Sequence, residues 1–407
     1  MKKTFVVQVI AINVYAFAIS FMWNSLHPLV MPYLIARLEP DFKNTFLGLI
    51  TAAGLVVATI VQPLAGGLSD RSRSRWGRRR PYILGGTMFD VVFLAMIAVS
   101  GSSWLLLITY CLLQTSSNVA HGPYQGLIPD LIPANKKGIA SGVKNLVELI
   151  ALVLGSAIIG SLLGNDHVGA ALFVMGAVLL ATMLITLVVV KEEPATTDAS
   201  DAAVPPLTLA GVFTELRRNS VFAWFILSRF LILAGLAAVR TFAQNYIQDV
   251  LHADNPAALA GSLMTVLGIS VLVVCLPAGY LADRFGRKRL NVLSALIGAV
   301  GTALMLGIGS YTHLVIFGSI VGVAVGIFMS ANWALAMDLI PAKEAALFLG
   351  LTNLATAGSG AVAGLLGPLI DSINHATPGQ GYSALFAVSA LAWLLGGIIL
   401  IRLPIKR

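Results

Sequence analysis

The sequence predicts an all-α membrane protein in which twelve transmembrane helices form two pseudo-symmetric bundles of six. Three observations predict this fold class: an apolar composition, twelve apolar segments of membrane-spanning length, and an internal repeat. Hydrophobic residues make up 57% of the 407 residues and charged residues only 11%, whereas soluble domains carry about 25% charged residues. A soluble chain of this composition could not cover its surface with polar side chains, so lipid is the expected solvent.

The apolar segments define the spans, because a helix needs about 20 mostly apolar residues to cross the hydrocarbon core. The first set covers residues 9–36, 46–68, 82–101, 104–128, 140–163 and 169–190. The second set covers residues 220–248, 258–281, 290–310, 312–337, 345–370 and 382–401. A polar, proline-containing linker at 191–219 lies between the sets. We therefore expect an N-terminal bundle over 1–190 and a C-terminal bundle over 220–407.

Basic residues predict the orientation. Most of the 26 lysines and arginines fall in the termini and the even-numbered connections, and such residues favour the cytoplasmic side. Both termini are therefore expected in the cytoplasm. The first apolar segment continues to about Ala36, past a short signal-like site, so we expect it to be retained as a span. Short connections and compact length favour a bacterial cell membrane.

Two sequence matches relate the halves. The stretch Gly66–Arg71 (GGLSDR) returns 213 positions later as Gly279–Arg284 (GYLADR). The pentapeptide Asp130–Ala134 (DLIPA) recurs identically 208 positions later at Asp338–Ala342. Matches that occur in the same order at equivalent connections indicate duplication of a six-helix unit. Parallel repeats of this kind are typical of one major class of secondary transporters.

At these residues the chain resembles the major facilitator superfamily over essentially its whole length. The stretch Gly279–Lys288 (GYLADRFGRK) is similar to that family's signature between its eighth and ninth helices. The first copy is longer, with five residues between Arg71 and Gly77, and looks like the glycoside and sucrose–cation symporter branch. The resemblance implies the major facilitator fold and a secondary transporter rather than an enzyme. Spans 9–36 and 46–68 lack the acidic residue usual in that branch.

The repeated motif is expected to act as a conformational latch. Its carboxylates can pair with neighbouring arginines or accept backbone N–H groups at a helix N-terminus, and its glycines allow a sharp turn. Asp70 is expected to pair with Arg71 or Arg78, and Asp283 with Arg284 or Arg287. The alternative is that these charges only set the topology on a solvated loop. The gating residues are Asp70, Arg71, Gly77, Arg78, Asp283, Arg284, Gly286 and Arg287.

Ionisable residues inside the spans are candidates for proton coupling, because placing them there is costly. Asp90 and Glu148 are the main candidates, and His27 is a further one because its ordinary pKa lies nearest neutrality. Glu148 could instead be neutralised by Lys144 one turn away, and Asp90 could pair with a buried arginine. Arg229 is expected to extend its charge toward the membrane surface.

Polar residues in the first, fourth, seventh and tenth spans are candidates for substrate binding, although single ones are often helix–helix contacts. His27 and Arg240 occupy equivalent positions of the repeat. The candidates are Asn24, His27, Gln114, Asn118, Tyr124, Arg240, Gln244, Tyr246, Asn332 and Trp333.

The leading expectation is proton-coupled symport of a sugar or glycoside. The alternatives are transport of an organic anion held by Arg240 and His27, or efflux of amphiphilic compounds or lipid. The sequence has no metal-ligand spacing and no glycine-rich phosphate loop, so neither a metal nor another cofactor is expected. The expected partners are a small-molecule substrate, protons and the lipid bilayer. Nucleic acid is not an expected partner, and the protein is expected to be a monomer.

Overall fold

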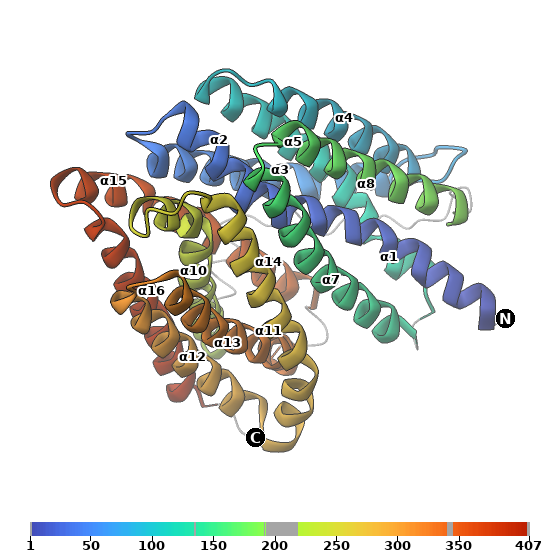
Figure 1. Cartoon of the computed structure of the whole chain (residues 1–407). Helices are drawn as coiled ribbons and strands as arrows, with labels where there is room; N and C mark the ends of the chain where they lie inside the picture. Colours follow the sequence, from blue (N-terminus) through green and yellow to red (C-terminus); the bar gives the residue numbers. More distant parts are fainter. Residues whose placement is uncertain (1, 134–135, 191, 193–218, 340–344, 405–407) are drawn as a thin grey trace. The chain divides into compact units, whose positions relative to one another are not determined.

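The computed structural model describes residues 2–133, 136–190, 192, 219–339 and 345–404. The predicted linker at 191–219 lies outside the described residues, apart from Glu192 and Asn219. The chain divides into two compact units, each described here by itself (Figure 1). Unit 1 comprises Met1–Pro40, Ala53–Asp201 and Ala257–Ser262, and unit 2 comprises Asp41–Ala52, Ala202–Pro256 and Leu263–Arg407.

Each of the twelve predicted spans corresponds to one helix or to a series of consecutive helices. The first six correspond to α1 (Lys2–Ser25) with η1 (Leu26–Val30) and α2 (Met31–Leu38), then α3 (Lys43–Asp70), α4 (Arg80–Ala98), α5 (Ser103–Gln125), α7 (Lys137–Gly164) and α8 (Val168–Val189). A short helix, α6 (Leu127–Leu131), follows α5. The last six correspond to α10 (Ser220–Asp249), α11 (Pro256–Phe285), α12 (Arg287–Leu304), α13 (Tyr311–Leu339), α14 (Ala345–Gly364) and α16 (Gln380–Arg402).

Length and composition support a membrane protein. In the described part of the chain, 10 of these helical segments are long and apolar enough to cross a membrane. α5 and α14 are not among them, and the centre of α5 carries the polar run Gln114–Asn118. The all-α membrane class predicted from the sequence is confirmed.

Two predicted spans are interrupted. The first, predicted as one helix over 9–36, contains the π-helical turn Leu26–Val30 around Pro28. Proline has no N–H group for the helical ladder, and π-turns inside helices are frequent at functional sites. The eleventh, predicted over 345–370, ends at Gly364, and a separate helix α15 (Gly367–Ala376) follows.

In unit 1, α1 packs against α7 and α8, and α4 packs against α5 and α8. The approach of α4 to α5 depends on Gly86, where an added Cβ would lie 2.6 Å from the Ser116 carbonyl oxygen. Close approach of this kind brings the polar face of α5 onto α4, and it positions the buried groups described below.

In unit 2, α10 packs against α14 and α16, and α12 packs against α13 and α16. Two glycines at four-residue spacing in α13, Gly322 and Gly326, face α11. A Cβ added at Gly322 would lie 3.1 Å from the Leu267 carbonyl oxygen, and a Cβ added at Gly326 would lie 3.1 Å from the Val271 carbonyl oxygen. Small residues let helix backbones approach where lipid supplies no hydrophobic drive, so these glycines allow α13 to pack closely against α11.

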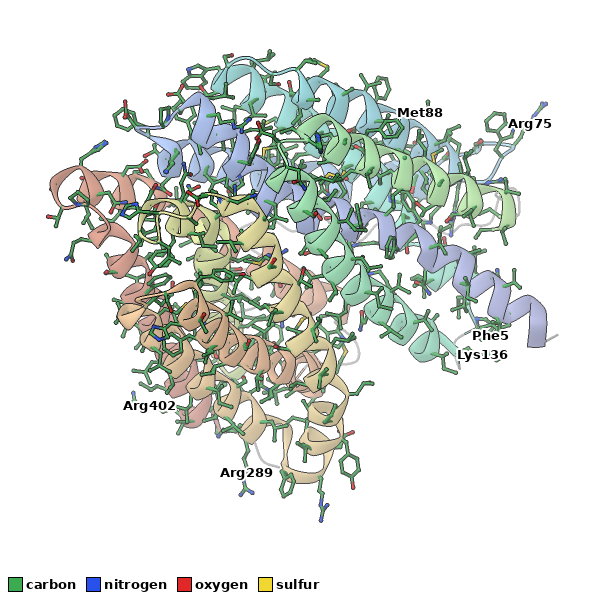
Figure 2. The ribbon with its side chains drawn as sticks, in the orientation of Figure 1. Phe5, Arg75, Met88, Lys136, Arg289 and Arg402 are labelled. Carbon is green, nitrogen blue, oxygen red and sulfur yellow. The ribbon has the colours of Figure 1, made fainter. Side chains whose placement is uncertain are left out.

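Basic residues gather at one end of each unit. In unit 1, Arg75 and Lys136 lie at the end that holds the start of α1 (Figure 2), and Lys136 Nζ lies 4.4 Å from the centroid of the Phe5 ring. In unit 2, Arg289 and Arg402 both lie at one end of that unit (Figure 2). The cytoplasmic placement of these ends remains a prediction.

Candidate functional site

In unit 1 the first copy of the repeated motif is organised around Arg79. Its Nη2 lies 2.7 Å from Asp70 Oδ1 and its Nε lies 2.8 Å from Asp130 Oδ2. Arg78 also pairs with Asp130, at 2.8 Å. The Arg79 side chain is 8% exposed, and it lies against Gly126, where any Cβ would collide with the guanidinium. Arg79 therefore joins the end of α3 to α6 through two carboxylates.

In unit 2 the second copy repeats this arrangement around Arg287. Its Nη2 lies 3.1 Å from Asp283 Oδ1 and its Nη1 lies 2.6 Å from Asp338 Oδ1. The carboxylates are 70% and 50% exposed, and a cavity of about 900 Å³ opens beside them. Because water reaches these groups, the pairs around Arg287 are more strongly screened than those around Arg79.

The structure corrects part of the predicted pairing. Asp70 pairs with Arg79 and not with Arg71 or Arg78, whereas Asp283 pairs with Arg287 as expected. Arg71 and Arg284 are exposed. Gly77 and Gly286 turn as expected, with φ of +102° and +100°.

The carboxylate at the start of α4 is also a different one. Glu192 accepts a 2.9 Å hydrogen bond from the Arg79 backbone N–H, so this residue, rather than Asp70, occupies the helix N-terminus. Burial raises the pKa of the Glu192 carboxyl.

Sequence reasoning missed four partners in these clusters: Arg79, Asp130, Glu192 and Asp338. The signal for two of them was present, since Asp130 and Asp338 open the identical repeated pentapeptide. Only the fold shows that both carboxylates meet the arginine of the preceding motif. Glu192 carried no such signal, because it lies more than 110 residues from Arg79 in a polar connection.

Asp90 is a buried carboxyl group in α4, with 1% exposure. Ser116 Oγ donates a 2.5 Å hydrogen bond to Asp90 Oδ1. One turn before Asp90, the hydroxyl groups of Tyr15 and Thr87 lie 2.5 Å apart. Within the described residues no cation lies within ion-pair distance of Asp90, so the predicted alternative of pairing with a buried arginine is not what the structure holds.

Glu148, the other coupling candidate, is paired. Its Oε1 lies 2.9 Å from Lys144 Nζ, and the two side chains are 33% and 24% exposed. Lys144 therefore neutralises Glu148, as considered from the sequence. Asp90 differs, because its partner Ser116 is neutral.

Four side chains of unit 1 form a hydrogen-bonded group around Tyr110. The Tyr110 hydroxyl lies 3.1 Å from His27 Nδ1 on the π-turn and accepts a 3.0 Å bond from Gln114 Nε2. Asn118 Nδ2 donates to Gln114 Oε1 at 3.1 Å. The Trp23 ring meets Tyr110 edge to face. The predicted residues His27, Gln114 and Asn118 are thus brought together.

Two other predicted residues of unit 1 lie apart from this group. Tyr124 is ten residues beyond Gln114, about 15 Å along the helix, and its hydroxyl donates to the Ile12 carbonyl at 3.1 Å. This is a helix–helix contact beneath the Tyr15 ring. Asn24 is half-buried near the end of α1.

In unit 2 the predicted substrate-binding residues differ in their burial and their contacts. Arg240 is half-buried and Gln244 is 2% exposed. The Tyr246 ring packs against the rings of Tyr382 and Phe386. Trp333 is 44% exposed on α13.

Asn332, the fully buried neighbour of Trp333, accepts a hydrogen bond from Arg229 Nη1. Arg229 Nη2 donates to Thr356 Oγ1 at 3.2 Å. Arg229 therefore points to α13 and α14, and the expectation that it extends toward the membrane surface was wrong.

A polar network that the sequence did not reveal joins the start of α3 to three helices of unit 2. Asn44 donates to Asp371 at 2.8 Å and accepts from Asn245 at 2.8 Å. Tyr382 donates to Asp249 at 2.5 Å, and Lys43 pairs with Asp249. Asp371 had not been identified from the sequence, because its partners lie more than 300 residues away.

Multiple membrane-spanning helices, a repeated Asp–Arg–Asp arrangement and buried polar groups inside the bundles define a multi-pass membrane transporter. The chain belongs to the Major Facilitator Superfamily, whose family profile matches residues 4–365 and 256–406. Membership makes the protein a transporter and not an enzyme.

Relatives and solved structures agree with this family. The chain is 22% identical over 392 residues to the multidrug resistance protein MdtG of Serratia proteamaculans, covering 93% of this chain and 90% of that one. It is 23% identical over 385 residues to MdtG of Klebsiella pneumoniae, with the same coverage.

Among solved structures, the nucleoside transporter NupG superposes with a TM-score of 0.79 at 14% identity, covering 98% of this chain and 100% of that one. The peptide transporter POT superposes with a TM-score of 0.71 at 14% identity, covering 97% and 93%. At this identity the structures establish the fold alone. None of these names is that of a sugar–cation symporter, so membership of that branch stays a proposal.

Proposed function

We propose that the protein is a proton-coupled transporter of a small hydroxylated solute, such as a sugar or glycoside, working by alternating access. We further propose that both termini are cytoplasmic and that the protein acts as a monomer in a bacterial cell membrane. The observation that carries the coupling is the buried Asp90 carboxyl, which accepts from the Ser116 hydroxyl at 2.5 Å.

The chemistry of Asp90 supports proton carriage. An ionised carboxylate without a cation in an apolar bundle costs several kcal/mol, and protonation removes that cost. Opening the bundle to water would stabilise the ionised form and release the proton. Asp90 therefore suits a step in which protonation alternates with exposure, whereas the Lys144 partner of Glu148 already neutralises that carboxylate.

The group around Tyr110 supports a hydroxylated solute. His27, Gln114 and Asn118 present hydrogen-bonding groups beside the Trp23 and Tyr110 rings. A few placed polar groups beside aromatic surface are typical of small-molecule sites.

A second candidate is export of amphiphilic compounds. It is favoured by the MdtG relatives, which are named multidrug resistance proteins and cover 93% of this chain. Their identity of 22–23% does not carry the substrate over.

Two experiments test the proposal. In the first, thermal unfolding of the purified protein is followed against saccharides, organic anions and amphiphilic cations, because a ligand of the folded state raises its stability by mass action. Stabilisation by saccharides, weakened in Tyr110→Phe, supports the proposal. Stabilisation by amphiphilic cations alone contradicts it in favour of export.

The second experiment uses proteoliposomes that contain a pH-sensitive dye. Asp90→Asn is expected to abolish proton movement with the solute while exchange of labelled solute continues. Glu148→Gln is the matched control, since it also removes a carboxylate from a span, and it is expected to retain proton movement. Proton movement that persists in Asp90→Asn rules out this coupling residue.

A further inference from the structure

Arg229 is a cation placed inside unit 2 without a counter-ion. It lies nine residues into α10, about 14 Å along the helix, in a segment that qualifies as a membrane span. Ion pairs within the described part of unit 2 include those of Lys43 and Arg287, whereas the polar contacts of Arg229 among the described residues are to neutral groups. An uncompensated charge at such a position is costly, so its presence needs a reason.

The groups around Arg229 are neutral. Asn332 Oδ1 and Thr356 Oγ1 accept from its two Nη atoms, and the guanidinium lies 5.9 Å from the centroid of the Phe328 ring. These contacts orient the guanidinium but do not neutralise it. A neutral amide could satisfy both acceptors at a lower desolvation cost, so the contacts do not explain the charge.

Two buried donors at this cluster have no acceptor among the described residues: Arg229 Nε and Asn332 Nδ2. Buried N–H groups are almost always paired, and leaving one without an acceptor destabilises the folded state. Two unmet donors beside an uncompensated cation match the requirements of an oxyanion, which brings negative charge and several acceptor lone pairs. The planar guanidinium suits a carboxylate or phosphate in particular.

The cluster is accessible at one side. Thr356 is exposed on α14 and Arg229 is only partly buried, whereas Asn332 and Phe328 are 0% and 2% exposed and form its closed side. An anion that arrives beside Thr356 can replace this hydroxyl on Arg229 Nη2, because the hydroxyl keeps its own bond to the Thr352 carbonyl at 3.0 Å.

We propose that Arg229 and Asn332 form a binding site for the carboxylate group of a soluble organic anion, with Thr356 at its entrance. This inference rests on the proposed transport function, because it adds a negatively charged group to the transported solute. The site is built from residues of unit 2 alone, whereas the Tyr110 group and Asp90 belong to unit 1. Binding can therefore be tested without coupling.

The test measures binding to the full-length purified protein by thermal unfolding and calorimetry. The probe is sodium gluconate, and its matched control is sorbitol, which differs in carrying a hydroxymethyl group in place of the carboxylate. Gluconate is expected to stabilise the wild type and sorbitol to do so much less. Arg229→Met is expected to weaken gluconate binding at least about tenfold, which equals about 1.4 kcal/mol.

Asn332→Asp keeps the test valid if Arg229→Met fails to fold. This variant supplies an internal carboxylate to Arg229, so it is expected to be at least as stable as the wild type while losing gluconate binding. Arg402→Met, which removes an exposed arginine at the end of α16, is expected to bind as the wild type does. Gluconate binding by the wild type without proton movement in the dye assay would separate a failure of coupling from a failure of binding.

Two results overturn the proposal. One is gluconate binding of equal affinity in the wild type, Arg229→Met and Asn332→Asp. The other is Arg229-dependent stabilisation by phosphatidylglycerol over phosphatidylcholine in nanodiscs without a response to gluconate, which would assign the site to a lipid headgroup.

Discussion

Asn44 Nδ2 donates a 2.8 Å hydrogen bond to Asp371 Oδ1, joining two residues of unit 2 that are 327 positions apart in the sequence. The other carboxylate oxygen of Asp371 accepts from the backbone N–H and the hydroxyl of Thr45, each at 2.7 Å. Asn44 and Asp371 are 1% and 5% exposed. The buried charge is thus satisfied by three donors at the start of one helix.

Removing this carboxylate should destabilise the protein. Asp371→Ala leaves the backbone N–H and the hydroxyl of Thr45 without this acceptor, whereas Asn44 Nδ2 keeps its 3.2 Å bond to the Tyr382 hydroxyl. We therefore expect a loss of about 2 kcal/mol in the free energy of unfolding. Thermal unfolding of the purified protein measures the change. Asp254→Asn, which alters an exposed acidic residue in the α10–α11 connection, should leave the midpoint within about 1 °C. Equal midpoints for both variants would contradict the structural role assigned to Asp371.

The two arginines of the repeated motif should differ in their contribution to stability. Arg79→Ala leaves Asp70 without its partner, whereas Asp130 keeps its pair with Arg78. Because the Arg79 side chain is 8% exposed and it donates to both carboxylates, we expect a cost of about 2 kcal/mol. Arg287→Ala breaks the equivalent pairs, but its carboxylates are 70% and 50% exposed, so screening by water should hold the cost below about 1 kcal/mol. Chemical unfolding in detergent measures both.

The control for these variants is Arg71→Ala, since Arg71 is exposed and takes no part in the ion pairs of the described residues. It should change the free energy of unfolding by less than about 0.5 kcal/mol. A larger effect for Arg287→Ala than for Arg79→Ala would show that burial does not determine the strength of these pairs.

The two motif glycines separate backbone strain from steric contact. Gly77 and Gly286 both have φ near +100°, a conformation that costs other residues about 1–3 kcal/mol. At Gly77 a Cβ would also lie 2.5 Å from a Glu192 carboxylate oxygen, whereas at Gly286 it meets nothing within 4 Å. Gly77→Ala should therefore lower the unfolding midpoint more than Gly286→Ala. Equal decreases in the unfolding midpoint would show that the Glu192 side chain moves away from the added Cβ without a cost in stability.

Glu192 predicts a pH dependence of stability. Burial raises the pKa of its carboxyl above the ordinary 4.5, outweighing the hydrogen bond from Arg79 and the nearby arginine charges. The folded state therefore binds this proton more tightly than the unfolded state. The resulting stabilisation is complete below pH 4.5 and is lost as the pH rises through the raised folded-state pKa.

Glu192→Gln tests this dependence, because the amide oxygen can still accept from the Arg79 N–H. The variant should lose that part of the pH profile and be no less stable than the wild type at pH 7. Unfolding midpoints between pH 4 and pH 7 measure the difference between the two proteins. A difference that does not change with pH would mean that Glu192 has an ordinary pKa.

Much of the fold could be predicted from the sequence because its signals are local. Apolar runs of membrane-spanning length predicted the helices, and the repeated stretches at Asp70 and Asp283 predicted two related turns. The interruption at Pro28 and the end of the eleventh span at Gly364 were missed, since mean hydropathy does not change there. Pro28 lies inside the π-turn. Gly364 is the last residue of α14 and lies so close to Gly48 that an added Cβ would be 2.8 Å from the Gly48 carbonyl oxygen.

The candidate sites were predictable only in part. The sequence indicated Asp90, His27, Gln114 and Asn118, because polar residues in apolar spans are conspicuous by themselves. It could not assign their partners, since Ser116 and Tyr110 are residue types common in such helices and carry no signal of their own. The position of Arg229 was visible as well, but its direction was predicted wrongly.

The sequence by itself determined that this chain is a duplicated, twelve-helix membrane transporter, because hydropathy and repetition are properties of the chain. The tertiary structure alone decided which charges are neutralised: Arg79 and Glu148 have oppositely charged partners, whereas the partners of Asp90 and Arg229 among the described residues are neutral. The physical reason is that the cost of a charge in a bilayer depends on groups within about 4 Å, and helix packing brings those groups from distant parts of the sequence.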